Sequence, residues 1–166
     1  MHKLYSALMP LLILSACMPG QYTMTRSFSP SEVEPFLQSN HVVLTGQAFL
    51  RTRGGAVQYA AGSRVTLLPA TPYFIEYFEN VVSVRSLSGK AREGELGAEA
   101  AKYARTSTAD GQGNFAFSGI APGTYIIYCV IQWYASGSSL PEGGLVAKRL
   151  TVGDAPHQTY VLTRAN

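Results

Sequence analysis

Cys17 is the residue of this sequence whose neighbours point most clearly to a chemical reaction. Lys3 gives the start of the chain a positive charge, and an apolar run from Leu4 to Leu14 follows it. The small residues Ser15 and Ala16 then precede the cysteine. A charged start, a short apolar stretch and small residues at the cleavage point are typical of an export signal. The apolar run is shorter than the roughly 20 residues that a transmembrane helix needs, so no membrane-spanning helix is expected there.

The tetrapeptide Leu14-Ser15-Ala16-Cys17 resembles the lipobox of bacterial lipoproteins. The resemblance implies that the Cys17 thiol receives a diacylglyceryl group, that the leader 1–16 is removed, and that the new amine is acylated. Each buried CH₂ of such lipid contributes about 0.8 kcal/mol to membrane binding. Met18, not aspartate, follows the cysteine, and in this family that favours the outer membrane with the protein facing the periplasm. The inner membrane and the cell surface remain alternatives.

The composition favours one β-rich domain and argues against nucleic-acid binding. Removing the leader from the 166 residues leaves enough chain for one domain with a sizeable core. Charged residues make up 14% of the chain against a usual value of about 25%, while 16 glycines favour many turns. The formal net charge of +3 is small and the basic residues are scattered, so no nucleic acid is expected as a partner.

Residues 18–40 have the composition of a linker. They include Pro19, Pro30 and Pro35 and show no clean hydrophobic period. We therefore expect a lipidated N-terminus and flexible tether over residues 17–40, with one helical turn possible over Ser31–Gln38. A flexible chain of this length would span about 26 Å on average.

From His41 onward, short strand-like runs alternate with turn signals, which predicts an all-β sandwich. The clearest turns are Asp110-Gly111-Gln112-Gly113 and Ala121-Pro122-Gly123. Val81–Val84 either continues the strand expected at Tyr73–Phe78 or pairs with it. The expected strands are His41–Leu50, Arg64–Leu68, Tyr73–Phe78, Arg105–Ala109, Asn114–Ser118, Thr124–Tyr134, Leu145–Val152 and His157–Leu162.

One stretch between the strands has helical character. Leu96, Ala100 and Tyr103 fall on one helical face, and Glu99 and Lys102 are spaced to form an i,i+3 pair. This pattern predicts a short helical insert near residues 90–104.

Four sequence blocks resemble the carboxypeptidase regulatory-like domain over about residues 42–163. They are Thr45–Ala48, Gly62–Leu67, Thr108–Phe117 and Ile120–Tyr125. The resemblance implies a transthyretin-like Greek-key sandwich of about seven strands over residues 41–166. It also implies a non-catalytic accessory or interaction module, because the family domain carries no active site of its own.

The residues that could support catalysis or metal binding are weakly arranged. Cys129 lies in an apolar run and is expected to be a buried, inert thiol. His41 and His157 have no nearby carboxylates in the sequence, so a metal site is not expected. Asp110 is a single carboxylate, which is too few for a calcium loop. With no nucleophile elbow or phosphate loop present, we expect neither an enzyme nor a cofactor.

Aromatic residues provide the remaining functional hypothesis. The set Tyr73, Phe74, Tyr77, Phe78, Trp133 and Tyr134 could form an exposed platform for sugars or a protein hot spot. The candidate ligand-stacking residues are Tyr73, Tyr77, Trp133 and Tyr134. The alternative is that alternate members simply belong to the core.

Three function classes therefore remain. The first is a membrane-anchored structural or protein-interaction module with a protein partner in the cell envelope. The second is a glycan- or peptidoglycan-binding module that uses the aromatic residues. The third and most remote is an enzyme built around the polar stretch Ser86–Arg105.

Overall fold

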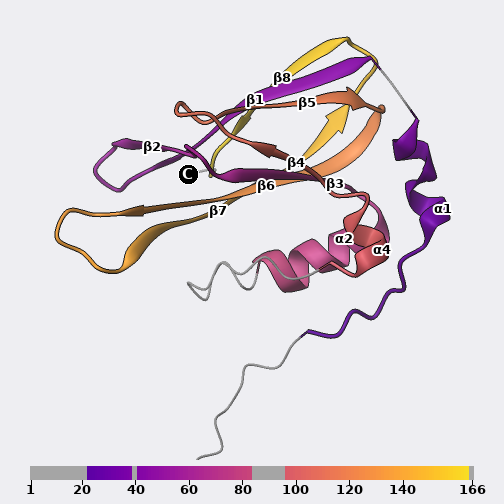
Figure 1. Cartoon of the computed structure of the whole chain (residues 1–166), viewed down its shortest axis with the longest axis horizontal. Coiled ribbons are helices and arrows are strands. Elements are labelled where there is room, and N and C mark those ends of the chain that lie inside the picture. Colours follow the sequence, from indigo (N-terminus) through magenta and orange to yellow (C-terminus); the bar gives the residue numbers. More distant parts are fainter. Residues whose placement is uncertain (1–21, 39–40, 84–95, 165–166) are drawn as a thin grey trace, which may run out of the picture.

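The computed structural model describes residues 22–38, 41–83 and 96–164, in which eight strands form two facing sheets (Figure 1). The all-β sandwich expected from the sequence is confirmed. The first sheet contains β1 (Val42–Arg51), β2 (Val57–Tyr59), β5 (Asn114–Ile120) and β8 (His157–Leu162). The second sheet contains β3 (Arg64–Pro69), β4 (Arg105–Thr108), β6 (Gly123–Tyr134) and β7 (Pro141–Val152).

Strand β1 organises the first sheet. It pairs antiparallel with β5 along one edge and parallel with β8 along the other. Strand β2 pairs only with the last three residues of β1, Phe49–Arg51. The second sheet has the order β4-β3-β6-β7 and is antiparallel throughout. The chain crosses repeatedly between the two sheets, as in a Greek-key sandwich.

The main core lies between the sheets and follows strand alternation. On β1, Val42, Leu44, Ala48 and Leu50 face inward and are buried, while the residues between them face outward. The face of β6 expected to be apolar, from Tyr125 to Ile131, packs into the same core. The alternation visible in the sequence therefore sets which faces of these two strands meet.

A second apolar layer covers the outer side of the second sheet, where helices α2 (Pro72–Tyr77) and α4 (Ala98–Ala101) lie (Figure 1). The strand expected at Tyr73–Phe78 is wrong, because this segment is helical and continues into the helical turn η2 (Phe78–Ser83). Its continuation as a strand through Val81 is wrong for the same reason, while Val84 lies outside the described residues. Pro72 suits the first turn of a helix.

Helical spacing explains the packing of this layer. Tyr73, Phe74 and Tyr77 are spaced for one helical face, and all three are buried. The short helix expected near residues 90–104 is confirmed at α4. Ala100 is buried and Leu96 packs against the same layer, as the spacing predicted.

The segment before the sandwich packs onto it and is called here the N-terminal strap (residues 22–38). It contains α1 (Pro30–Val33) and the 3-10 turn η1 (Glu34–Leu37). Val33 is fully buried in the second apolar layer, and Phe28 makes an edge contact with Tyr73 at 5.3 Å between ring centroids. Phe36 makes another with Tyr125 at 5.2 Å. The expected flexible tether is therefore wrong for residues 22–38, because their apolar side chains find partners in both cores.

Candidate functional site

The four aromatic residues expected to stack on a ligand do not form one surface. Tyr73 and Tyr77 belong to helix α2 and are buried in the second apolar layer, with 7% and 3% of their surface exposed. Trp133 and Tyr134 are neighbours on β6, so they point to opposite faces of the sheet. Trp133 packs partly against the main core, whereas Tyr134 is 68% exposed. A shared platform of these residues is wrong, and the core alternative is confirmed for Tyr73 and Tyr77.

The other residues considered for chemistry are not assembled into a reactive site in the part of the chain described. Cys129 is a buried free thiol, and burial raises its pKa to about 12, so it stays protonated at neutral pH. Across residues 22–38, 41–83 and 96–164, no group of three or more potential metal ligands is found. Cys17 lies outside the described residues, as does the first half, 86–95, of the polar stretch Ser86–Arg105.

No helix in the described ranges combines the length and hydropathy required to cross a bilayer.

An aromatic pair lies instead on the outer surface of the first sheet. Phe49 of β1 is directly opposite Tyr59 of β2, and their rings meet edge-to-face with centroids 6.4 Å apart. Tyr59 is 46% exposed and Phe49 is half-buried. The guanidinium carbon of Arg51 lies 5.9 Å from the centroid of the Phe49 ring, within cation–π range. Arg51 is in turn opposite Val57, and these four residues are called the aromatic face.

Strand geometry explains why this face is outside. Ala48 and Leu50 point into the core, so Phe49 and Arg51 must point to solvent. Phe49 could have been found from the sequence, because a large aromatic residue on the solvent side of an alternating strand points to an exposed apolar surface. The partner Tyr59 was missed, since β2 is only three residues long and too short to show a period.

Polar groups continue the same surface along the sheet. The hydroxyls of Thr45 and Thr159 are 3.0 Å apart, and the Gln47 side-chain amide donates to the carbonyl oxygen of Gln112 at 2.9 Å. Val161, which is paired with Gln47 across the parallel ladder, is 51% exposed. The surface therefore offers ring faces and an arginine at one end and hydroxyl and amide groups beside them. These groups can stack and hydrogen-bond.

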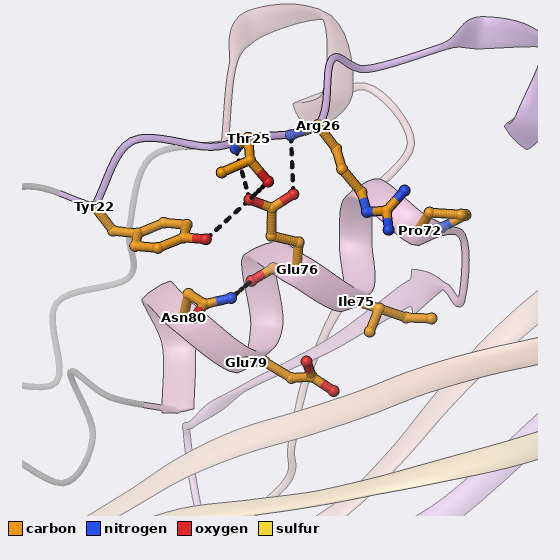
Figure 2. A pocket seen from close by; sticks show the side chains of 8 residues that line it. All are labelled: Tyr22, Thr25, Arg26, Pro72, Ile75, Glu76, Glu79 and Asn80. Atoms are coloured by element: carbon orange, nitrogen blue, oxygen red, sulfur yellow. Dashed lines mark hydrogen bonds between the residues drawn. The ribbon is translucent and has the colours of Figure 1, made fainter.

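A separate surface hollow of about 450 Å³ lies where the strap crosses α2 (Figure 2). The carboxylate of Glu76 points at the strap and accepts four hydrogen bonds from it, two from backbone N–H groups and two from side-chain hydroxyls. Oε1 accepts from the Thr25 N–H at 2.6 Å, the Thr25 hydroxyl at 2.8 Å and the Tyr22 hydroxyl at 2.9 Å. Oε2 accepts from the Arg26 N–H at 3.0 Å. The hollow is lined by Tyr22, Thr25, Arg26, Pro72, Ile75, Glu76, Glu79 and Asn80.

These hydrogen bonds join the strap to helix α2, and this set of contacts is called the Glu76 clamp. They lower the pKa of Glu76 to about 2, the Thr25 N–H contributing most, against the opposing effect of burial. The carboxylate therefore stays ionised at neutral pH. Because the folded-state pKa lies below the ordinary value of 4.5, its stabilising contribution is present above that value and is lost as pH falls toward 2. Both carboxylate oxygens are already occupied, so the hollow is a weaker ligand site than the aromatic face.

Comparison with known proteins places the fold. The structure aligns with the crystal structure of PA1324 from Pseudomonas aeruginosa, described as a candidate carbohydrate-binding protein, with a TM-score of 0.71. The two sequences are 30% identical, and the alignment covers 84% of this chain and 99% of PA1324. The chain belongs to the PA1324 family. Since nearly all of PA1324 is matched, the likeness is not confined to one sheet of the sandwich.

Two other solved structures align less well than the PA1324 family member. (S)-Allantoin synthase has a TM-score of 0.33 and 10% identity, covering 76% of this chain and 42% of that one. The pilus backbone protein RrgB of Streptococcus pneumoniae has a TM-score of 0.30 and 11% identity, covering 74% and 41%.

No protein-family model matches the chain, and a search of curated proteins also finds no match. The resemblance to the carboxypeptidase regulatory-like domain agrees with the sandwich fold and otherwise stays an interpretation of the sequence motifs.

Proposed function

We propose that this protein is a non-catalytic carbohydrate-binding module whose binding surface is the aromatic face. The observation that carries the proposal is the pairing of the exposed Tyr59 with the half-buried Phe49, with Arg51 held over the Phe49 ring. Membership of the PA1324 family supports it, because carbohydrate binding is the candidate role of PA1324. These two points favour the glycan-binding hypothesis over a general protein-interaction role.

The chemistry of the surface fits a sugar polymer. The apolar C–H face of a pyranose ring stacks on an aromatic ring, and its hydroxyls hydrogen-bond to neighbouring polar groups. Tyr59 would supply the stacking surface, while Thr45, Thr159 and Gln47 lie farther along the same sheet. A single aromatic contact contributes only about 0.5–1.5 kcal/mol, so repeated units of a polymer would bind better than a monosaccharide.

Tyr59→Ala is expected to weaken polysaccharide binding about tenfold, which corresponds to about 1.4 kcal/mol. The measurement is affinity electrophoresis of the full chain in gels that contain neutral glucan, acidic polysaccharide or peptidoglycan fragments. Tyr134→Ala is the matched control, because Tyr134 is also an exposed strand tyrosine but lies on the second sheet.

The two variants separate the possible results. Retarded migration lost in Tyr59→Ala and kept in Tyr134→Ala supports the aromatic face. Retardation that is lost only in Tyr134→Ala would show that the binding site lies on the β6–β7 hairpin instead. Migration of the native protein unchanged by every polysaccharide would overturn the carbohydrate-binding proposal.

We also propose that the protein is anchored through lipid on Cys17, in the outer membrane and facing the periplasm. The docked strap supports a short connection, because only residues 18–21 separate Cys17 from Tyr22. Five residue steps of at most about 3.6 Å would hold the start of the strap within about 18 Å of the lipid. The binding module would then work close to the membrane surface, and many anchored copies on one polymer would add avidity.

Cys17→Ala is expected to abolish labelling with a palmitate analogue and to move the protein out of the membrane fraction. The control is Cys129→Ala, since Cys129 is buried and is expected to carry no lipid. Normal membrane fractionation of Cys17→Ala would contradict the anchor.

A further inference from the structure

We infer that the carbohydrate bound by the aromatic face is an acidic polysaccharide, whose carboxylates are held by Arg51 and Arg53. This inference rests on the proposed carbohydrate-binding function and narrows its ligand class. Both arginines are exposed, Arg51 at the end of β1 and Arg53 in the turn that leads to β2. Both lie on the turn side of the Phe49–Tyr59 pair, toward which a sugar stacked on Tyr59 could extend its substituents.

The turn that carries Arg53 is well defined. The Thr52 hydroxyl accepts from the Ala56 N–H at 3.1 Å, and the Thr52 N–H donates to the Ala56 carbonyl at 2.9 Å. The Gly55 N–H also donates to the Thr52 carbonyl at 2.9 Å. These bonds close the turn that directly follows the Arg51–Val57 pair, so the backbone of Arg53 is held in a defined turn and is not on a loose loop.

Within the described part of the chain, neither β1, β2 and the turn between them nor the neighbouring strand β8 carries an acidic side chain that could offset the two arginines. The sequence between Glu34 and Glu76 contains no Asp or Glu, and neither does β8. In the described residues, no ion pair is formed by Arg51 or Arg53. The carboxylate of Asp110, in the turn before β5, accepts three hydrogen bonds from the residues of its own turn.

Charge complementarity therefore selects an anionic ligand. An arginine guanidinium remains protonated at any physiological pH and can bind a carboxylate through two parallel hydrogen bonds. The position of Arg51 over the Phe49 ring orients its guanidinium before a ligand arrives. A neutral glycan would cover these cations without offering them a counter-charge, whereas a uronic acid polymer supplies one carboxylate per unit.

The test compares polymers that differ only in charge. Biolayer interferometry of the full chain is run on polygalacturonate and hyaluronan, on their methyl-esterified forms, and on a neutral glucan. We expect at least one acidic polymer to bind at least tenfold more tightly than its ester. Its binding should weaken between about 0.1 M and 1 M salt, because the screening length falls from about 10 Å to about 3 Å.

Arg51→Gln is expected to lower acidic-polymer binding about tenfold. Arg149→Gln is the matched control, since Arg149 is an exposed arginine on β7 of the other sheet and should leave binding unchanged.

Each further outcome contradicts a different statement. Equal binding of acid and ester, or binding of the glucan alone, would overturn the acidic ligand and leave the carbohydrate-binding module standing. Equal losses in Arg51→Gln and Arg149→Gln would overturn the role of Arg51. Binding of no polymer in any form would overturn the proposed function itself.

Discussion

A chain that begins at His41 will lose cooperative unfolding, whereas a chain that begins at Tyr22 will keep it. The N-terminal strap supplies Val33 to the second apolar layer, and Phe28 and Phe36 pack against the two cores. Burying an aliphatic or aromatic side chain contributes roughly 1.5–3 kcal/mol, so loss of the strap removes about 5 kcal/mol. That is comparable with the whole stability of many domains, about 5–15 kcal/mol. Thermal unfolding followed by circular dichroism, together with binding of a hydrophobic dye, measures the effect.

Point variants separate the strap's packing from its length. Val33→Asp in the full chain is expected to destabilise nearly as much as the deletion, because it places a carboxylate in a fully buried apolar site. Ser31→Asp is the control, since Ser31 is exposed on the same helical turn. A chain starting at His41 with the melting temperature and dye binding of the longer chain would show that the strap is dispensable.

Gly46→Ala is expected to destabilise the sandwich by about 3 kcal/mol. Gly46 lies in the middle of β1, between β5 and β8. A Cβ at this position would overlap both the ring of Phe115 and the backbone carbonyl oxygen of Tyr160. The ring could rotate away, but the carbonyl could not move without disturbing the ladder between β1 and β8. Urea unfolding gives the change in free energy of unfolding.

Gly153→Ala is the matched control, because an added Cβ there meets no atom within 4 Å. It should change the free energy of unfolding by less than about 0.5 kcal/mol. Equal stability of Gly46→Ala and the native protein would contradict the close approach of β8 and Phe115 to β1.

Much of the sandwich was predictable because its signals are local. Alternation along β1 and β6 shows which side chains face inward, and this depends only on the period of a strand. The turn at Asp110 was predictable from its residue types. The structure shows the Asp110 carboxylate accepting hydrogen bonds from the N–H groups of Gln112 and Asn114. The spacing of Leu96 and Ala100 likewise indicated the face that α4 buries.

The helix α2 shows where local signals are insufficient. The six residues from Tyr73, five of them apolar or aromatic, fit a covered strand as well as a buried helix, because so short a run has no distinguishing period. Pro72 at its start and the apolar surface of β6 beneath it decide the outcome. The same burial removes Tyr73 and Tyr77 from any ligand surface.

The sequence by itself determined the all-β class and the inward faces of the long strands, and it is the whole basis for the proposed lipid attachment at Cys17, since each depends on neighbouring residues. Tertiary structure alone decided the strap, the Glu76 clamp and the aromatic face. Glu76 meets Thr25 from 51 positions away, and Phe49 meets Tyr59 only through the pairing of β1 with β2. Such sites depend on which distant segments pack together, and the hydrophobic period of a single segment does not show which other segment it contacts.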